Sequence, residues 1–202
     1  IQKNRMMITG ILLAAGLSSR FGSQKLIATL PSGLPIAVAS WRALKEAHDN
    51  SITVIRHDDA ILKTIFESEK IPFLICQDAH LGMARSLLTG IQNTLNSDGW
   101  IIALGDMPLI DPETIKIIAK ATSDQEIRKL VFRPTFHKKP GNPVGLRSTL
   151  LDELMGLQGD EGARQIIKSH ISDTHFIPVE DEGIIKDIDT QQDLETISTK
   201  KN

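Results

Sequence analysis

The first residues that could do chemistry lie in a loop directly after an apolar run near the N-terminus. Residues 13–16 read L-A-A-G and continue into L-S-S-R-F-G-S-Q-K at residues 17–25. Glycine in such a loop lets backbone N–H groups approach phosphate oxygens, while Arg20 and Lys25 supply positive charge. The pattern predicts a site for a nucleoside phosphate, and a flexible connection with solvated charges is the alternative. The candidate nucleotide-binding residues here are Ala14, Ala15, Gly16, Ser18, Ser19, Arg20, Gly22 and Lys25.

This loop differs from two well-known phosphate-binding motifs. A Walker A loop, G-x-x-x-x-G-K-[ST], would need glycine where Phe21 stands and lysine where Gly22 stands. The loop also lacks the G-x-G-x-x-G spacing of dinucleotide-binding loops. As a loop residue, Lys25 is expected to bury little surface.

A carboxylate follows the most apolar predicted strand, which reads W-I-I-A-L at residues 100–104. Asp106 stands in the sequence G-D-M-P just after this run. Capping of the next helix is already supplied by Asp111, with Pro112 at the first helical position and Glu113 in the first turn. Asp106 is therefore left over for another role.

A second spare carboxylate lies near the C-terminus. Thr190 and Asp193 form a capping signal for the last predicted helix, which leaves Asp189 without that duty. Mg²⁺ prefers a few carboxylates together with waters and phosphate oxygens, so Asp106 and Asp189 are predicted metal ligands. For both, an exposed loop acid is the alternative interpretation. Asp187 lies two residues before Asp189 and would share a face with it in a strand. It is predicted to be either a residue that supports the metal ligands or a surface charge.

The elements that position these residues alternate between short apolar runs and longer helix-period segments. Strands are predicted at residues 8–15, 52–56, 73–76, 100–104, 130–133 and 175–179. Helices are predicted at residues 36–48, 59–70, 83–95, 112–121, 150–157, 161–169 and 191–197. The alternation indicates βαβ units, and continuous apolar strands favour a sheet covered by helices on both faces. The predicted fold class is α/β, a Rossmann-like three-layer α/β/α arrangement with a mostly parallel sheet.

The stretch 133–147 interrupts this alternation with prolines and basic residues. Such a stretch predicts a lid, an edge hairpin or a binding loop. Open α/β sheets bind ligands at the carboxyl ends of their strands, so function is expected in the loops at that edge.

Composition and charge exclude several classes of protein. The 202 residues are 41% hydrophobic and 24% charged, with a formal net charge of −2. This is typical of a water-soluble globular protein and argues against disorder, membrane spanning and nucleic-acid binding. The single cysteine, Cys76, is expected to be buried, in a reducing, cytoplasmic setting. One domain is expected at residues 8–202, preceded by a tail or an artificial remnant at residues 1–7.

These motifs together resemble the MobA-like nucleotidyltransferases, whose signature loop is roughly L-A-[AG]-G-x-S-x-R-x-G-x-x-K. Five further blocks follow in the family's order: G-M-A-R-S-L-L-T-G-I at residues 82–91, L-G-D-M-P-L-I at 104–110, G-N-P-V-G-L at 141–146, G-D-E-G-A-R at 159–164 and D-I-D-T at 187–190. The combination is most similar to the MocA-like molybdenum cofactor cytidylyltransferases, which implies a fold of the nucleotide-diphospho-sugar transferase type.

The resemblance implies transfer of CMP from CTP to the phosphate of molybdopterin cofactor, with release of pyrophosphate. It implies Mg²⁺ on Asp106 and Asp189. It also places Gly82, Met83 and Ser86 beside the base and ribose of the nucleotide. The expected catalytic residues are Arg20, Lys25 and Asp106.

An acceptor that carries a phosphate would be steered by charge toward the basic stretch 133–147, although a solvated charge run is the alternative. Asn142 departs from the histidine that the family commonly has in its block. Asp160 and Arg164 enter by resemblance alone, since Asp160 could cap the helix at 161–169 and Arg164 could pair locally. The acceptor-binding candidates are Arg133, Lys138, Asn142, Asp160 and Arg164.

Three alternatives stand beside cytidylyl transfer: a guanylyltransferase of the same family, a transferase with another small phosphate acceptor, and a non-catalytic protein that binds and delivers molybdenum cofactor. CTP is expected to be preferred over GTP, because the methyl group of Ala15 takes up space that a purine could use. The expected partners are CTP or another nucleoside triphosphate, a molybdopterin-type acceptor and a molybdoenzyme that receives the product. No nucleic-acid or membrane partner is expected.

Overall fold

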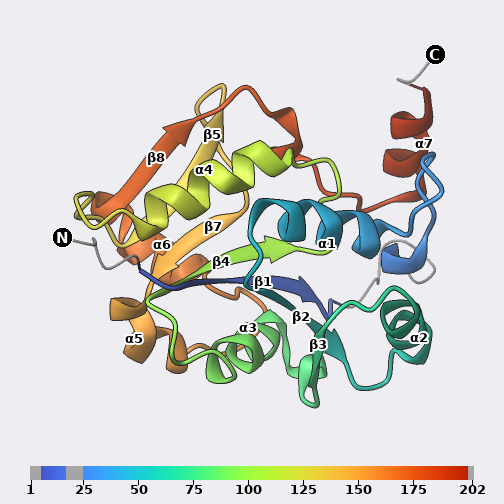
Figure 1. Cartoon of the computed structure of the whole chain (residues 1–202), viewed down its shortest axis with the longest axis horizontal. Helices are drawn as coiled ribbons and strands as arrows, with labels where there is room; N and C mark the ends of the chain where they lie inside the picture. Colours follow the sequence, from blue (N-terminus) through green and yellow to red (C-terminus); the bar gives the residue numbers. More distant parts are fainter. Residues whose placement is uncertain (1–5, 17–24, 200–202) are drawn as a thin grey trace.

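The computed structural model of the chain describes residues 6–16 and 25–199. In this part of the chain, a central sheet is covered by helices on both faces (Figure 1). The predicted α/β fold class with three layers is confirmed.

The first four strands form the parallel half of the sheet. They are β1 (Ile8–Ala14), β2 (Ser51–Arg56), β3 (Phe73–Cys76) and β4 (Gly99–Leu104). The pairs β3 with β2, β2 with β1 and β1 with β4 are all parallel. Each strand agrees with its predicted range to within one residue at either end. Because Leu13 of β1 pairs with Leu104 of β4, the carboxyl ends of these two strands lie side by side.

The second half of the sheet is mixed. Its strands are β5 (Val131–Phe136), β6 (Lys139–Pro140), β7 (Val144–Arg147) and β8 (Thr174–Pro178). Strand β7 is antiparallel to both β4 and β5, whereas β8 is parallel to β5. The order across the sheet is β3-β2-β1-β4-β7-β5-β6, with β8 also paired to β5.

The stretch 133–147 is a hairpin rather than a lid. Strand β5 continues to Phe136, and the chain reverses at His137 and Lys138, whose φ angles are +47° and +66°. The chain returns as β6, which pairs with β5 at the end of the strand order, so the predicted edge hairpin is observed there. The stretch then continues as β7, which lies inside the sheet because it pairs with both β4 and β5, and its Val144 and Leu146 belong to the buried core.

The helices pack into two separate cores. They are α1 (Ile36–Ala47), α2 (Ala60–Ser68), α3 (Met83–Gln92), α4 (Pro112–Ser123), α5 (Leu151–Met155), α6 (Arg164–Ser169) and α7 (Gln191–Thr199). Helices α1, α2 and α4 share one core with Leu12 and Phe132 of the sheet, and α7 packs against it. Helices α3, α5 and α6 share the other core with Ile11 and Trp100. Successive strand residues thus point to opposite faces, and both faces are buried.

Two helix starts test the expectations about capping. The Asp111 side chain accepts a hydrogen bond from the Glu113 N–H (2.8 Å), with Pro112 in the first turn of α4, as predicted. Helix α6 begins at Arg164 and has no side-chain cap at its start, so the proposed cap by Asp160 is wrong. The helix starts three residues later than its predicted range, which places Asp160 in the preceding loop.

Five short 3₁₀ turns complete the described elements: η1 (Lys25–Ile27), η2 (Ala79–Leu81), η3 (Ser148–Leu150), η4 (Ile171–Asp173) and η5 (Glu182–Ile185). In the part of the chain that the structure describes, every helix is too short or too polar to cross a membrane.

Candidate active site

Asp106 is held at the carboxyl end of β4 by the residue before it. The Gly105 N–H donates to the Leu13 carbonyl (2.9 Å), and the Ser40 hydroxyl of α1 donates to the Gly105 carbonyl (2.9 Å). A Cβ atom added at Gly105 would lie only 3.2 Å from the Ala14 Cβ, so the ends of β1 and β4 are in close contact. Asp106 is therefore fixed beside the start of the glycine-bearing loop.

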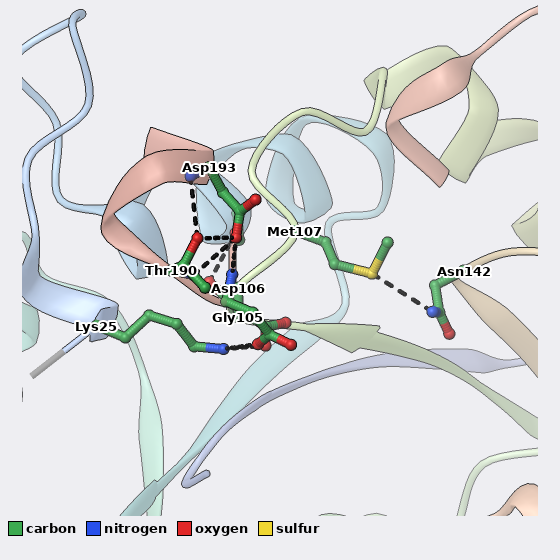
Figure 2. Close-up of polar contacts among 9 residues, drawn as sticks. Lys25, Gly105, Asp106, Met107, Asn142, Thr190 and Asp193 are labelled. Atoms are coloured by element: carbon green, nitrogen blue, oxygen red, sulfur yellow. Dashed lines mark hydrogen bonds and ion pairs between the residues drawn. The ribbon is translucent and has the colours of Figure 1, made fainter. Parts of the chain in front are cut away.

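Asp189 reaches the same place from the C-terminal segment. The Ile188 N–H donates to the Asp106 carbonyl (2.9 Å), which sets the two acidic residues beside each other. The N–H groups of Asp189 and Thr190 donate to Asp193 Oδ2 at 3.0 and 2.7 Å. The Asp193 N–H in turn donates to the Thr190 hydroxyl oxygen (3.2 Å). The predicted capping signal of Thr190 and Asp193 at the start of α7 is confirmed (Figure 2). It also holds the backbone of Asp189.

Lys25 joins the two carboxylates. Its Nζ donates to Asp106 Oδ2 at 2.8 Å and to Asp189 Oδ1 at 2.7 Å. Figure 2 shows the Lys25 side chain extending toward Asp106 at the end of the strand. The Lys25 side chain is only 12% exposed, so the expectation that it buries little surface is wrong. The expectation failed because the two residues that bury Lys25 lie 81 and 164 positions away in the sequence, where no local pattern identifies them.

The charges at this site perturb one another. Burial lowers the pKa of Lys25, but its hydrogen bonds with Asp106 and Asp189 outweigh burial, and the pKa is raised above the ordinary value. Lys25 is therefore charged at physiological pH. The pKa of Asp187 is also raised, first by desolvation and further by repulsion from Asp189 and Asp106. Asp187 lies in the irregular segment between η5 and α7, so the interpretation that it shares a strand face with Asp189 is wrong.

The two carboxylates fit a divalent cation. Asp106 Oδ1 is buried and has no hydrogen-bond partner, which is costly unless a cation or water satisfies it. Across residues 6–16 and 25–199, no three His, Cys, Asp or Glu side chains form a group that could hold a metal ion. Mg²⁺ commonly takes one or two carboxylates and completes its shell with waters and substrate phosphates. Asp106 and Asp189 are therefore suited to an ion that arrives with a phosphate ligand.

The segment at the start of α3 is tied to the loop before α6. Gly82 has a φ of +113°, and a Cβ atom there would lie 2.5 Å from the Gly159 carbonyl and 2.6 Å from Asp160 Oδ1. The Ala84 N–H donates to the same Gly159 carbonyl (3.0 Å). Only glycine suits this position, because both the backbone conformation and the close approach exclude a side chain. Asp160 is thus brought beside Gly82. The other two predicted nucleotide-binding residues of this segment differ in burial: Met83 is exposed and Ser86 is buried.

The hairpin brings some of the acceptor candidates toward Asp106. The Asn142 amide donates to Met107 Sδ (3.4 Å), directly after Asp106 (Figure 2). The Arg133 guanidinium donates to the Gly141 carbonyl at 3.2 and 3.1 Å. Burial lowers the pKa of Arg133, and repulsion from Arg164 lowers it further.

Lys138 lies apart from these residues. It occupies the exposed turn between β5 and β6, and within the described residues no hydrogen bond or ion pair ties its side chain to the carboxylates.

The signature loop is described only at its two ends. Ala14 and Ala15 are buried, Gly16 is exposed, and Lys25 begins η1. The predicted nucleotide-binding residues Ser18, Ser19, Arg20 and Gly22 lie outside the described residues.

Comparison with known proteins shows the family of this chain. A family model described as the MobA-like NTP transferase domain matches residues 10–174. The chain belongs to this family. The match contains the loop at 13–25, Asp106 and the hairpin, and it ends before Asp189.

Several proteins are similar to this member of the MobA-like family. The purine catabolism protein PucB of Bacillus subtilis (strain 168) is 28% identical over 200 residues, covering 94% of this chain and 95% of PucB. The manganese complex of Rv0371c from Mycobacterium tuberculosis H37Rv has a TM-score of 0.78 at 21% identity, covering 95% and 97% of the two chains. The molybdopterin-guanine dinucleotide biosynthesis protein A of Archaeoglobus fulgidus has a TM-score of 0.67 at 18% identity, with the same coverage. The predicted nucleotidyltransferase fold is confirmed.

The sequence did not predict the hydrogen bonds that hold the backbone around the two carboxylates. Ser40 reaches the Gly105 carbonyl while also donating to the Ile36 carbonyl four residues earlier (3.1 Å). A serine inside a helix commonly makes only the second of these bonds, so no sequence signal identifies its role. The contact between Asn142 N–H and the Ile184 carbonyl (2.9 Å) was missed as well. Gly141 marks this contact in the sequence, since a Cβ atom there would meet the Ile184 carbonyl, but the sequence does not identify the partner.

Proposed function

We propose that this protein transfers CMP from CTP to the phosphate of a molybdopterin-type acceptor and releases pyrophosphate, with Mg²⁺ as the metal ion. The observation that supports it best is the cluster of Lys25, Asp106 and Asp189 at the adjoining ends of β1 and β4. It combines one buried cation, two carboxylates and an unpartnered buried carboxylate oxygen at the edge where open α/β sheets bind nucleotides.

The proposed chemistry is a single in-line displacement at the α-phosphate of CTP. The acceptor phosphate is already an anionic nucleophile, so the residues need to position and neutralise charge rather than remove a proton. Arg20 and Lys25 bind the triphosphate, while Asp106 and Asp189 hold the metal ion. When bound there, the ion would stabilise the negative charge that develops toward pyrophosphate.

The base is proposed to lie beside Gly82, Met83 and Ser86. The methyl group of Ala15 belongs to the same buried core as Ala84 in the first turn of α3. Because a smaller space favours a pyrimidine, we propose CTP over GTP. A difference of one methyl group supports only about 1–3 kcal/mol of preference, so the α3 segment must contribute too.

The acceptor is proposed to approach from the hairpin side. The positive charges of Arg133 and Arg164 repel each other, and an acceptor phosphate bound by both would neutralise them. Asn142, Asp160 and Lys138 complete the proposed acceptor set. The rest of the acceptor is proposed to be molybdopterin-like, with a molybdoenzyme as the recipient of the product.

One prediction tests the acceptor side directly. Replacing the exposed Arg164 with glutamine (Arg164→Gln) should raise the KM for the acceptor about tenfold, because one charge-assisted hydrogen bond is lost. The KM for CTP and the melting temperature should stay unchanged. Lys168→Gln removes the same charge from the same helix and serves as the control. An unchanged acceptor KM in Arg164→Gln would remove this residue from the acceptor site.

The experiment that tests the proposed function is a pyrophosphate-release assay with CTP, GTP, ATP and UTP. Each nucleotide is supplied with Mg²⁺ or Mn²⁺ and with molybdopterin or a simple phosphate monoester as acceptor. Release with CTP and molybdopterin at a rate well above GTP is expected. Equal use of GTP would overturn cytidylyl specificity, and binding of the acceptor without pyrophosphate release from any nucleotide would favour the non-catalytic delivery protein.

Several further proposals concern the setting of the protein. We propose a single catalytic domain over residues 8–202, which works in the cytoplasm and has no nucleic-acid or membrane partner. The buried, unpaired Cys76 supports a reducing compartment.

A further inference from the structure

The ammonium group of Lys25 occupies the place between two carboxylates where a metal ion would bind. Its Nζ lies 2.8 Å from Asp106 Oδ2 and 2.7 Å from Asp189 Oδ1, and the lysine side chain is 12% exposed. Such distances are typical of charge-assisted hydrogen bonds. The chain's own ammonium group thus already neutralises the pair of carboxylates.

A second cation cannot share this place. Mg²⁺ binds carboxylate oxygens at about 2.0–2.1 Å, so an ion that bridged Asp106 and Asp189 would come into contact with Nζ. The unpartnered Asp106 Oδ1 belongs to the same carboxylate as the oxygen that Lys25 binds. An ion at Oδ1 would therefore also be repelled by the ammonium group while that group stays in place.

The two carboxylates are held far more firmly than the lysine head group. The backbone of Asp106 accepts from the Ile188 N–H (2.9 Å), and the Asp189 N–H donates to Asp193 Oδ2 (3.0 Å). The carboxylates are short side chains on this fixed backbone. Lys25 carries its charge at the end of four rotatable carbon–carbon bonds, so it can leave the pair while the carboxylates stay.

We infer that Lys25 is an internal competitor of the metal ion, which keeps metal affinity low until a nucleoside triphosphate takes over the ammonium group. The inference rests on the proposed function for the identity of the nucleotide, but the competition between lysine and metal does not. It predicts that nucleotide and metal ion bind cooperatively, because each favours the arrangement in which Lys25 has left the carboxylates.

Mn²⁺ binding to the full chain tests the inference without any turnover, using the electron paramagnetic resonance signal of free Mn²⁺. In the absence of nucleotide, Lys25→Met should bind Mn²⁺ at least tenfold more tightly than the parent protein. Lys25→Arg keeps the charge and should resemble the parent. Lys116→Met removes a surface lysine that pairs with Glu113 and should leave Mn²⁺ affinity unchanged. Adding Asp106→Asn to Lys25→Met should abolish the tight binding.

Addition of CTP should tighten Mn²⁺ binding by the parent protein much more than by Lys25→Met. Equal Mn²⁺ affinities of parent and Lys25→Met without nucleotide would overturn the competition, as would tight binding by Lys25→Arg. If Lys25→Met binds more tightly but CTP has no effect on the parent, the competition is confirmed and the assignment of CTP as substrate fails. Circular dichroism of each variant establishes that the fold is intact.

Discussion

Asp106→Asn should lower the turnover number for nucleotidyl transfer by 10²–10³ while leaving the fold intact. The substitution keeps the volume of the side chain but removes the charge of the group that Lys25 binds and that the proposed metal needs. Loss of one strong electrostatic contact to the transition state costs about 3–4 kcal/mol, which corresponds to this fall in rate. Steady-state pyrophosphate release measures the effect, and circular dichroism and thermal unfolding report on the fold.

Asp111→Asn is the matched control for this prediction. It removes the same charge five residues later, at the position that caps α4, and asparagine caps helices about as well as aspartate. Turnover and stability of Asp111→Asn should therefore match the parent. A turnover number of Asp106→Asn within threefold of the parent, with unchanged circular dichroism, would show that Asp106 is not part of the active site.

The parallel half of the fold could be predicted because its signals are local. Strands β1 to β4 are continuous apolar runs, and the helices between them follow the helical period. Elimination singles out the two carboxylates as site candidates, since Asp111 and the pair of Thr190 with Asp193 account for the helix starts nearby. The capping interactions occur as predicted, which leaves Asp106 and Asp189 for the proposed site.

The mixed half could not be predicted because its interactions are distant in sequence. Strand β7 is only four residues long, and its place between β4 and β5 depends on pairing with residues about 45 positions earlier, such as Trp100 with Leu146. The burial of Lys25 likewise depends on Asp106 and Asp189, which no local pattern connects to it. Lys25 becomes buried only when the segments that carry Asp106 and Asp189 come together at the edge of the sheet.

The contact between the hairpin and the C-terminal segment leads to the second large prediction. Gly141 and the backbone of Ile184 are so close that a Cβ atom on Gly141 would lie 2.3 Å from the Ile184 carbonyl oxygen. The next residue, Asn142, donates its backbone N–H to the same carbonyl (2.9 Å). A side chain at position 141 would therefore displace segment 184–189, which carries Asp189 and bonds to Asp106 through the Ile188 N–H.

Gly141→Ala should lower the melting temperature by about 6–12 °C, because overpacking against a backbone costs about 3 kcal/mol and each kcal/mol shifts the melting temperature of a chain of this size by about 2–4 °C. The displaced segment carries Asp189, so nucleotidyl transfer should also fall by at least tenfold, as small misplacements of reacting groups have large effects on rate. Gly156→Ala is the control: its nearest contact would be 3.4 Å, from the Glu153 carbonyl oxygen, and its φ of −84° suits alanine. Differential scanning calorimetry and pyrophosphate release measure the two effects. If Gly141→Ala matched Gly156→Ala in both, the hairpin contact would not be what positions Asp189, and the hydrogen bond of Ile188 with Asp106 together with the capping interactions of α7 would hold it in place.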